Sequence, residues 1–214
     1  MKRLILFGPP ASGKGTFSGQ IKKILPNIAH ISTGDIFREN LKNKTPLGLK
    51  TKEYMDKGEL VPDDIVIDMV RDRLNQEDAK QNGFILDGFP RTQAQNQALS
   101  EITEIDLFLL LVLDKSIITK RILGRYGCKN CGEIYNKYTL PPKVEGKCDK
   151  CSAEIKFEQR SDDNEETLKS RLDAYEKNAK PIIKYYKKRG KLRKVDATDT
   201  LKYTNDDIKN IVEI

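Results

Sequence analysis

Five short segments along the chain, most of them almost continuously apolar, are predicted to form β-strands: residues 3–7, 28–31, 84–86, 107–113 and 192–195. Between them, apolar residues recur at helical spacing, and the first helix is expected over 14–25, stopping at Pro26. Strands that are apolar throughout must be covered on both faces, and intervening helices make such strands parallel. The pattern therefore predicts an α/β fold with a doubly wound, five-stranded parallel sheet.

Two stretches interrupt this alternation. Residues 33–75 have the pattern of consecutive helices with no strand between them, with breaks expected at Pro46, Gly58 and Pro62. Residues 125–160 contain Gly, Pro and Cys but show no helical period. Both are predicted to be insertions at the carboxyl ends of strands, where doubly wound folds bind their ligands.

A long, polar-faced helix is expected over residues 164–189, bent at Pro181. The pair Asp162-Asp163 precedes it. We interpret this pair as a hinge and as the N-cap of the helix, without a chemical role.

Length and charge narrow the class of protein. The chain has 214 residues, which suits one domain with insertions, and 39 Lys and Arg against 32 Asp and Glu give a formal net charge of +7. An excess of positive charge favours an anionic partner, and it does not choose among nucleotides, nucleic acids and membrane surfaces. The chain has a single histidine, His30, so acid–base catalysis by histidine is not expected. We expect His30 to be structural.

Membrane insertion and export are not expected. The longest apolar run, residues 107–113, is far shorter than the ~20 residues that span a bilayer. The apolar segment after Met1 meets Gly8 too soon to be the core of a signal peptide. We therefore expect a cytoplasmic protein.

A glycine-rich loop lies between the first predicted strand and the first predicted helix. Residues 8–16 read Gly-Pro-Pro-Ala-Ser-Gly-Lys-Gly-Thr and match the phosphate loop G-x-x-x-x-G-K. In such a loop the backbone N–H groups and the helix N-terminus surround an anion, and Lys14 would reach the β- and γ-phosphates. Asp87 ends the third apolar segment and is expected to hold Mg²⁺ through water, although an aspartate there can also cap a helix.

All four cysteines lie close together in the second insertion. Their spacing is C-x2-C, sixteen residues, then C-x2-C, which is typical of a zinc site with the ligands Cys128, Cys131, Cys148 and Cys151. Four thiolates leave no open coordination position, so the metal would be structural. Rubredoxin-like iron, two disulfides and four free thiols remain alternatives.

Four motifs occur in an order that resembles adenylate kinase. They are Gly-Lys-Gly-Thr at 13–16, His-Ile-Ser-Thr-Gly-Asp at 30–35, Leu-Asp-Gly-Phe-Pro-Arg at 86–91 and Gln-Arg-Ser-Asp-Asp at 159–163. The resemblance runs from residue 3 to the C-terminus and is to the long-lid form that carries a zinc knuckle. It implies the reaction Mg·ATP + AMP ⇌ 2 ADP.

The resemblance also implies a division of the chain. It assigns residues 32–61 to an AMP-binding domain, 124–163 to a lid over ATP, and 1–31, 62–123 and 164–214 to the core. Both insertions are expected to close over the substrates and exclude water. A monomer is expected, because nothing in this scheme requires a residue from a second copy.

Site residues follow from the resemblance, position by position. For ATP it implies Ala11, Ser12, Gly13, Lys14, Gly15, Thr16, Arg125, Ile134, Tyr135 and Asp199. For AMP it implies Thr33, Arg38, Glu59, Leu60, Val61, Gly88, Phe89, Pro90, Arg91, Gln95, Arg160 and Arg171. The cations expected to act in catalysis are Lys14, Arg38, Arg91, Arg125, Arg160 and Arg171, which suits a phosphoryl transfer that needs positioning and positive charge.

One segment departs from the family pattern. Residues 195–199 read Val-Asp-Ala-Thr-Asp, where the family often has Val-Asp-Gly-Thr-Lys at a loop against the adenine. The strength of adenine selection on the ATP side therefore stays open.

Three other functions were weighed against this interpretation. A kinase for another monophosphate, GMP or UMP/CMP, would share the phosphate chemistry, but Thr33 and Gln95 favour adenine because both can hydrogen-bond its edge. A nucleic-acid-binding zinc ribbon is disfavoured by the absence of arginine between residues 128 and 151. A nucleotide sensor without turnover would not need the full set of arginines.

Overall fold

A five-stranded parallel sheet forms the centre of the molecule. The computed structural model describes residues 1–155, 160 and 162–214, so Gln159 and Ser161 of the fourth motif lie outside the described residues. The strands lie in the order β2 (Ala29–Ser32), β3 (Gly83–Asp87), β1 (Lys2–Phe7), β4 (Leu107–Val112) and β7 (Leu192–Asp196). All neighbouring pairs are parallel, which confirms the predicted fold class.

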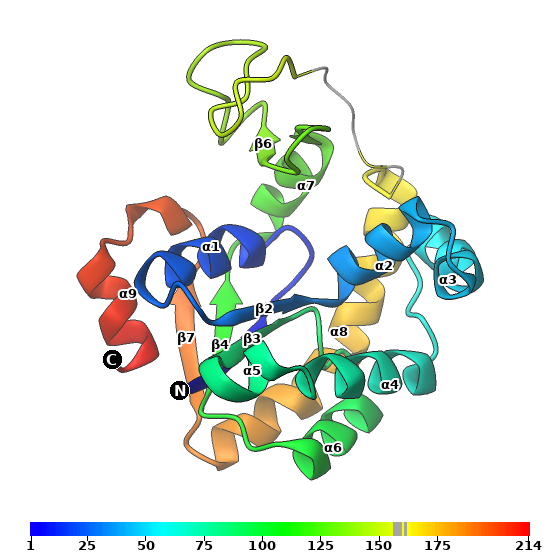
Figure 1. Ribbon diagram of the computed structural model, residues 1–214, viewed down its shortest axis with the longest axis vertical. Helices are drawn as coiled ribbons and strands as arrows, with labels where there is room; N and C mark the ends of the chain where they lie inside the picture. The colour runs from blue at the N-terminus through cyan, green and yellow to red at the C-terminus, as the bar shows by residue number, and fades with distance from the viewer. Residues whose placement is uncertain (156–159, 161) are drawn as a thin grey trace.

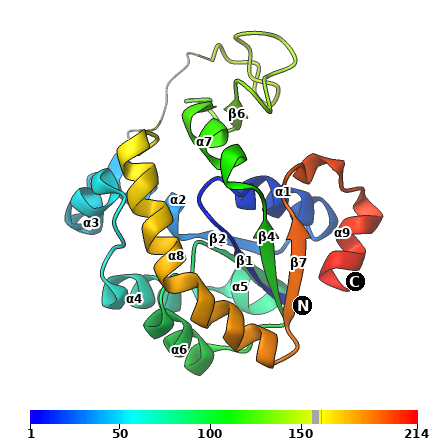
Figure 2. The same cartoon turned by 180° about the vertical axis from the view of Figure 1, so that it is seen from behind.

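Alternate residues of each strand are buried on opposite faces of the sheet. In β1, Leu4 and Leu6 pack with α1 (Lys14–Ile24) and α9 (Asn205–Val212). Ile5 and Phe7 pack on the other face with α4 (Asp63–Leu74), α6 (Gln93–Ile102) and α8 (Glu165–Lys188). Figure 1 shows α1 and α9 on the near side, and Figure 2 shows α8 crossing the opposite side. The two short connecting helices are α5 (Glu77–Asn82) and α7 (Lys115–Leu123).

The first insertion consists of α2 (Thr33–Lys42) and α3 (Pro46–Lys57), which pack against each other between β2 and α4. The three predicted breaks are confirmed. Pro46 begins α3, Gly58 ends it, and Pro62 precedes the first residue of α4. Proline suits the first turn because its missing N–H would have no partner there.

The second insertion begins with an antiparallel hairpin of β5 (Arg125–Gly127) and β6 (Ile134–Asn136), which stands above α7 in Figure 1. The rings of Tyr126 and Tyr135 stack across the hairpin at 5.8 Å. Both rings are buried against the cysteines that follow. Within the described part of this insertion there is no helix, as the sequence pattern predicts.

The expected N-cap of α8 was wrong. The capping residue is Asn164, whose side-chain oxygen accepts from the backbone N–H of Thr167 at 2.9 Å. A cap must directly precede the first helical residue, and α8 begins only at Glu165. Asp162 and Asp163 instead form ion pairs with arginines, so they have an electrostatic role that the sequence interpretation missed.

The parallel register brings the ligand-binding ends of the strands together. Leu6 pairs with Asp87, and Ser32 pairs with Asp87 on its other side, so β1, β2 and β3 end side by side. The phosphate loop, the first insertion and the loop after β3 all leave from this edge. In the part of the chain that the structure describes, no helix is long and apolar enough to cross a membrane.

The close packing of the strands can be tested at two glycines, one with near neighbours and one without. Gly83 has φ +80°, and a Cβ there would lie 2.2 Å from the carbonyl oxygen of Lys2, a backbone atom of the neighbouring strand. Gly19, within α1, has no atom within 4 Å of its Cβ position. We expect Gly83→Ala to lower the free energy of unfolding by at least about 2 kcal/mol and Gly19→Ala to raise it by up to about 1 kcal/mol. Urea unfolding checks both, and equal stability of the two variants would contradict the close approach at Gly83.

Candidate active site

The phosphate loop joins β1 to the first turn of α1. Lys14 is the first residue of α1, and its ammonium donates to the carbonyl oxygens of Gly8 (3.1 Å) and Pro9 (2.9 Å) and to Ser12 Oγ (3.3 Å). The side chain therefore lies over the loop itself. Backbone N–H groups at a helix start have no partner within the helix and, with the helix dipole, favour an anion. Loop and lysine together form a site suited to phosphate.

Asp87 lies beside this loop at the end of β3. The carboxylate of Asp87 is 3.6 Å from Nε2 of His30 in the neighbouring strand β2. Carboxylate oxygens are the ligands that Mg²⁺ prefers, so the residue type and its place next to a phosphate site fit the predicted role. His30 lies within the sheet, in β2.

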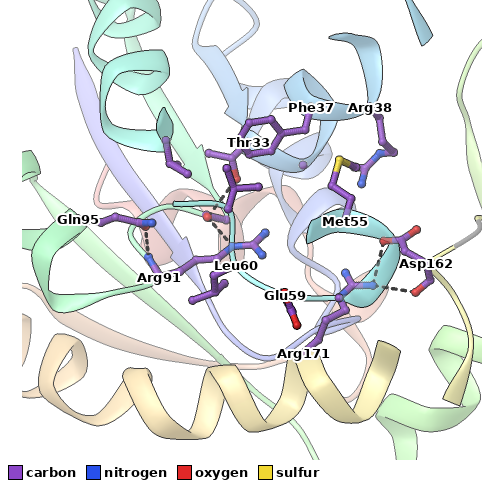
Figure 3. A pocket seen from close by; sticks show the side chains of 15 residues that line it. Thr33, Phe37, Arg38, Met55, Glu59, Leu60, Arg91, Gln95, Asp162 and Arg171 are labelled. Carbon is purple, nitrogen blue, oxygen red and sulfur yellow. Dashed lines mark hydrogen bonds and ion pairs between the residues drawn. The ribbon is translucent and has the colours of Figure 1, made fainter. Parts of the chain in front are cut away.

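A cleft lies between the first insertion, residues 58–61 and the loop after β3 (Figure 3). Phe37, Met55 and Val66, which the sequence interpretation did not assign, give the cleft an apolar wall. Asp162 adds a carboxylate. Nine residues predicted to bind AMP also line it: Thr33, Arg38, Glu59, Leu60, Val61, Gly88, Arg91, Gln95 and Arg171. Apolar walls with a few convergent polar groups are typical of small-molecule sites.

The loop after β3 is tightly fitted into this cleft. Thr33 Oγ1 donates to the carbonyl oxygen of Gly88 at 3.1 Å, and Arg91 Nε donates to the same oxygen at 2.8 Å. Gly88 has φ +82°, and a Cβ there would lie 2.8 Å from Thr33 Oγ1 and 2.9 Å from Arg91 Nη2. Only glycine allows both side chains to reach this carbonyl.

Three of the predicted catalytic arginines are paired with carboxylates. Arg38 Nη2 lies 2.5 Å from Asp35 Oδ1, and Arg171 Nη1 lies 3.1 Å from Asp162 Oδ2. Arg125 binds Asp163 with both arms of its guanidinium, one of them through Nε at 2.7 Å. The Asp163 side chain is fully buried. Each carboxylate fixes the orientation of a guanidinium that would otherwise be repelled by its neighbours.

Two of the predicted catalytic arginines have a lowered pKa, for which loss of hydration is the larger cause and repulsion by other arginines the smaller one. Burial lowers the pKa of Arg91 to about 10, and the positive charge of Arg171 adds to the effect. Burial also lowers the pKa of Arg160 to about 10, followed by the charges of Arg38 and Arg125. The predicted catalytic cations therefore act on one another across the cleft, although they come from distant parts of the chain.

Several predicted site residues have side chains that are engaged within the protein itself, in the core, the cysteine cluster or a helix cap. Phe89 is buried in the core, and Pro90 is buried beside it. The Tyr135 hydroxyl donates to Cys148 Sγ at 3.4 Å and accepts from the backbone N–H of Asp149 at 2.7 Å, so both of its hydrogen bonds are made within the cysteine cluster. Asp199 caps the short 3-10 helix η1 (Thr200–Lys202) by accepting from the N–H of Leu201.

Arg121 is a site residue that the sequence interpretation missed. Its guanidinium donates to the carbonyl oxygens of Ala197 (2.9 Å) and Thr198 (2.8 Å), and at 3.4 Å to that of Ala11 in the phosphate loop. It therefore joins that loop to the segment where the chain departs from the family pattern. Arg121 lies in the last turn of α7, and none of the four sequence motifs includes it.

The four cysteines form one cluster in the second insertion. All four Sγ atoms lie within 4.8 Å of one another, with 3.6 Å between Cys128 and Cys151 and 3.5 Å between Cys131 and Cys148. A tetrahedral ion with Zn–S bonds of about 2.3 Å would hold its sulfurs ~3.8 Å apart, whereas a disulfide needs about 2.05 Å. The cluster therefore fits a tetrahedral metal, and the four cysteines are free.

The amino-acid sequence is similar to those of known proteins. The family model described as adenylate kinase matches residues 6–191. Curated adenylate kinases from Clostridium botulinum (strain Loch Maree / Type A3) and Clostridium novyi (strain NT) are each 47% identical, covering 98% and 99% of this chain and 98% of their own lengths. One from Caldicellulosiruptor bescii is 52% identical over 89% of both chains.

This chain belongs to the adenylate kinase family. It is accordingly an enzyme, an ATP:AMP phosphotransferase, and the alternative of a kinase for another monophosphate is not supported. Adenylate kinases act on Mg·ATP, AMP and ADP.

The ionisation of Lys14 provides a test of this site's electrostatics. Burial lowers its pKa from 10.5 to about 8; the charge of Asp87 opposes this, and Arg91 adds to it. Between pH 8 and 10.5 the unfolded chain therefore binds more protons at this residue than the folded chain, so its contribution to stability rises with pH. We therefore expect the free energy of unfolding of wild type to rise relative to that of Lys14→Met as the pH increases from 8 to 10.5.

Urea unfolding from pH 7 to 10.5 measures this difference. The control is Lys22→Met, at an exposed position of the same helix, whose stability difference from wild type should stay constant. A difference for Lys14→Met that does not change with pH would contradict the burial of a charged lysine in the phosphate loop.

Proposed function

We propose that the cleft of Figure 3 binds AMP and that the phosphate loop binds Mg·ATP, with the predicted catalytic cations between them. The observation that carries this proposal is the convergence of cations from separate elements, since Arg38, Arg91 and Arg171 line one cleft. Arg91, Arg125 and Arg171 all act on the ionisation of Lys14, although they come from the loop after β3, the lid base and α8. A loose phosphoryl transition state needs positive charge on all sides of the transferred group, which this arrangement would supply.

The reaction needs no catalytic base in this scheme. The acceptor is a phosphate whose second pKa is near ~6, so its oxygen is already ionised at neutral pH. Arginine suits the positions around it, because its planar guanidinium can bind two phosphate oxygens at once. Asp87 would hold Mg²⁺ through water, and the ion would add positive charge at the ATP phosphates.

We further propose that residues 32–61 and 124–163 move as an AMP-binding domain and a lid over a core of 1–31, 62–123 and 164–214. Arg125 and Asp163 support this division, because their ion pair joins the two places where the chain crosses between lid and core. On substrate binding, phosphates would compete with Asp162 and Asp163 for Arg171 and Arg125. Closure would then exclude water from the reacting phosphates.

We propose zinc as the ion held by Cys128, Cys131, Cys148 and Cys151. The four sulfurs fit a closed tetrahedral site, and the hydroxyl of Tyr135 supports one of them. The apolar cluster around them is small, so the ion would provide most of the stability of this part of the lid. We expect the enzyme to act as a cytoplasmic monomer that binds neither nucleic acid nor membrane.

The direct test is diphosphate formation from Mg·ATP with AMP, GMP, UMP and CMP in parallel. We expect rapid ADP formation with AMP and little turnover of the other three. Lys14→Ala should lose several orders of magnitude in kcat, because it removes a charge that stabilises the transferred phosphate, while thermal unfolding shows an intact fold. Equal turnover of several monophosphates, or an active Lys14→Ala enzyme, would contradict the proposed site.

Removal of the metal tests the lid separately. Treatment with a chelator strong enough to strip four thiolates should lower the melting temperature, since the site links residues 128–131 to 148–151. Metal analysis before and after treatment identifies the ion, and zinc re-addition should restore the original melting curve. An unchanged curve after confirmed metal loss would rule out the structural role.

A further inference from the structure

The side-chain amide of Gln95 is held at both of its ends. Oε1 accepts from the backbone N–H of Arg91 at 2.7 Å, a contact drawn in Figure 3, and Nε2 donates to Oδ1 of Asp63 at 2.7 Å. Gln95 lines the cleft proposed for AMP but is only 1% exposed, so neither bond is readily replaced by water. Its orientation is therefore set by the protein.

Asp63 is itself fixed by its surroundings. Its second oxygen, Oδ2, accepts from Thr92 Oγ1 at 2.9 Å, and Thr92 Oγ1 in turn accepts from the backbone N–H of Gln95 at 3.1 Å as the N-cap of α6. Asp63 is also the first residue of α4, where the helix dipole favours a carboxylate. The network joins the start of α4 to the loop after β3, two elements that approach each other only in the folded chain.

This arrangement gives the amide a fixed polarity. An ionised carboxylate can only accept hydrogen bonds, and a backbone N–H can only donate. A flipped amide would place its NH₂ against the N–H of Arg91 and its oxygen against Asp63, losing two buried hydrogen bonds. The two existing bonds leave one acceptor position on Oε1 and one N–H on Nε2.

A fixed donor and acceptor can distinguish two purines that have the same shape. Adenine presents an exocyclic amino donor beside a ring-nitrogen acceptor, whereas hypoxanthine and guanine present a carbonyl acceptor beside a ring N–H donor at the same two positions. An amide that hydrogen-bonds both adenine positions would place acceptor against acceptor and donor against donor at the same positions of hypoxanthine or guanine. Rejection of this kind is strong, because the wrong base leaves buried polar groups unpaired.

We infer that Asp63 is a positioning residue that sets the specificity for adenine at the AMP site by locking the amide polarity of Gln95. This inference rests on the proposed contact of Gln95 with the base of AMP. Asp63 does not line the cleft, so it acts through Gln95 rather than on the nucleotide. No part of the sequence pattern points to this residue.

The test compares AMP with IMP, which differs from it only at the two positions concerned. For wild type, Asp63→Ala and Asp63→Asn, kcat/KM is measured for each monophosphate with Mg·ATP in excess. Asp63→Ala removes the acceptor for Nε2, and we expect the AMP-to-IMP ratio of kcat/KM to fall by at least about tenfold. The ratio does not depend on the folded fraction of a variant, and KM for ATP should stay unchanged.

Two further variants separate positioning from charge. Asp63→Asn keeps an oxygen that can accept from Nε2 but removes the negative charge, so it should keep the ratio within about threefold of wild type. Asp64→Ala removes the neighbouring exposed charge from the same helix turn and should leave the ratio unchanged.

An Asp63→Ala enzyme that discriminates as well as wild type would overturn the inference, and so would an Asp63→Asn enzyme that loses as much as Asp63→Ala. Both results would leave the proposed function intact. A wild-type enzyme that does not prefer AMP would instead overturn the proposed function itself.

Discussion

Guanidinium groups that converge on one cleft repel one another, and this repulsion is the constraint on which the site depends. Loss of hydration is the larger cause of the lowered pKa of Arg91 and of Arg160, and the positive charge of neighbouring arginines lowers each pKa further. Carboxylates placed between the cations offset part of the cost, with Asp162 and Asp163 beside Arg171 and Arg125. Polyphosphate is the natural complement of such a cluster, because it brings the negative charge that the cations lack.

The same ion pairs connect electrostatics to the organisation of the chain. Arg125 and Asp163 lie at the two ends of the second insertion, so a bond between them fixes its base. Asp35, in the first turn of α2, pairs with Arg38 one turn further along the helix. In each insertion a predicted catalytic arginine is therefore paired with a carboxylate. In the function that we propose, competition between phosphate and these carboxylates would link nucleotide binding to the positions of the two insertions.

The parts of the molecule that surround the site differ in how much buried apolar structure supports them. The phosphate loop and the loop after β3 leave from central strands of the sheet, whose residues are buried on both faces. The cysteine cluster, by contrast, rests on a small apolar group that includes Tyr126, Tyr135 and Ile155. The metal that we propose for this cluster would compensate for a core of this size, because it would join distant residues without requiring much buried area.

The sequence by itself determined the parallel α/β fold, the breaks in the helical insertion, the phosphate loop and the cysteine cluster. These features are encoded in short runs of residues, where apolar periodicity, proline and glycine, or ligand spacing act over a few positions. Only the tertiary structure decided that Asp162 and Asp163 pair with arginines rather than cap α8, that Arg121 joins Ala11 to Ala197, and that Asp63 meets Gln95. The physical reason is that such contacts join side chains far apart in the chain, and their distance depends on how the packed elements are oriented rather than on any local pattern.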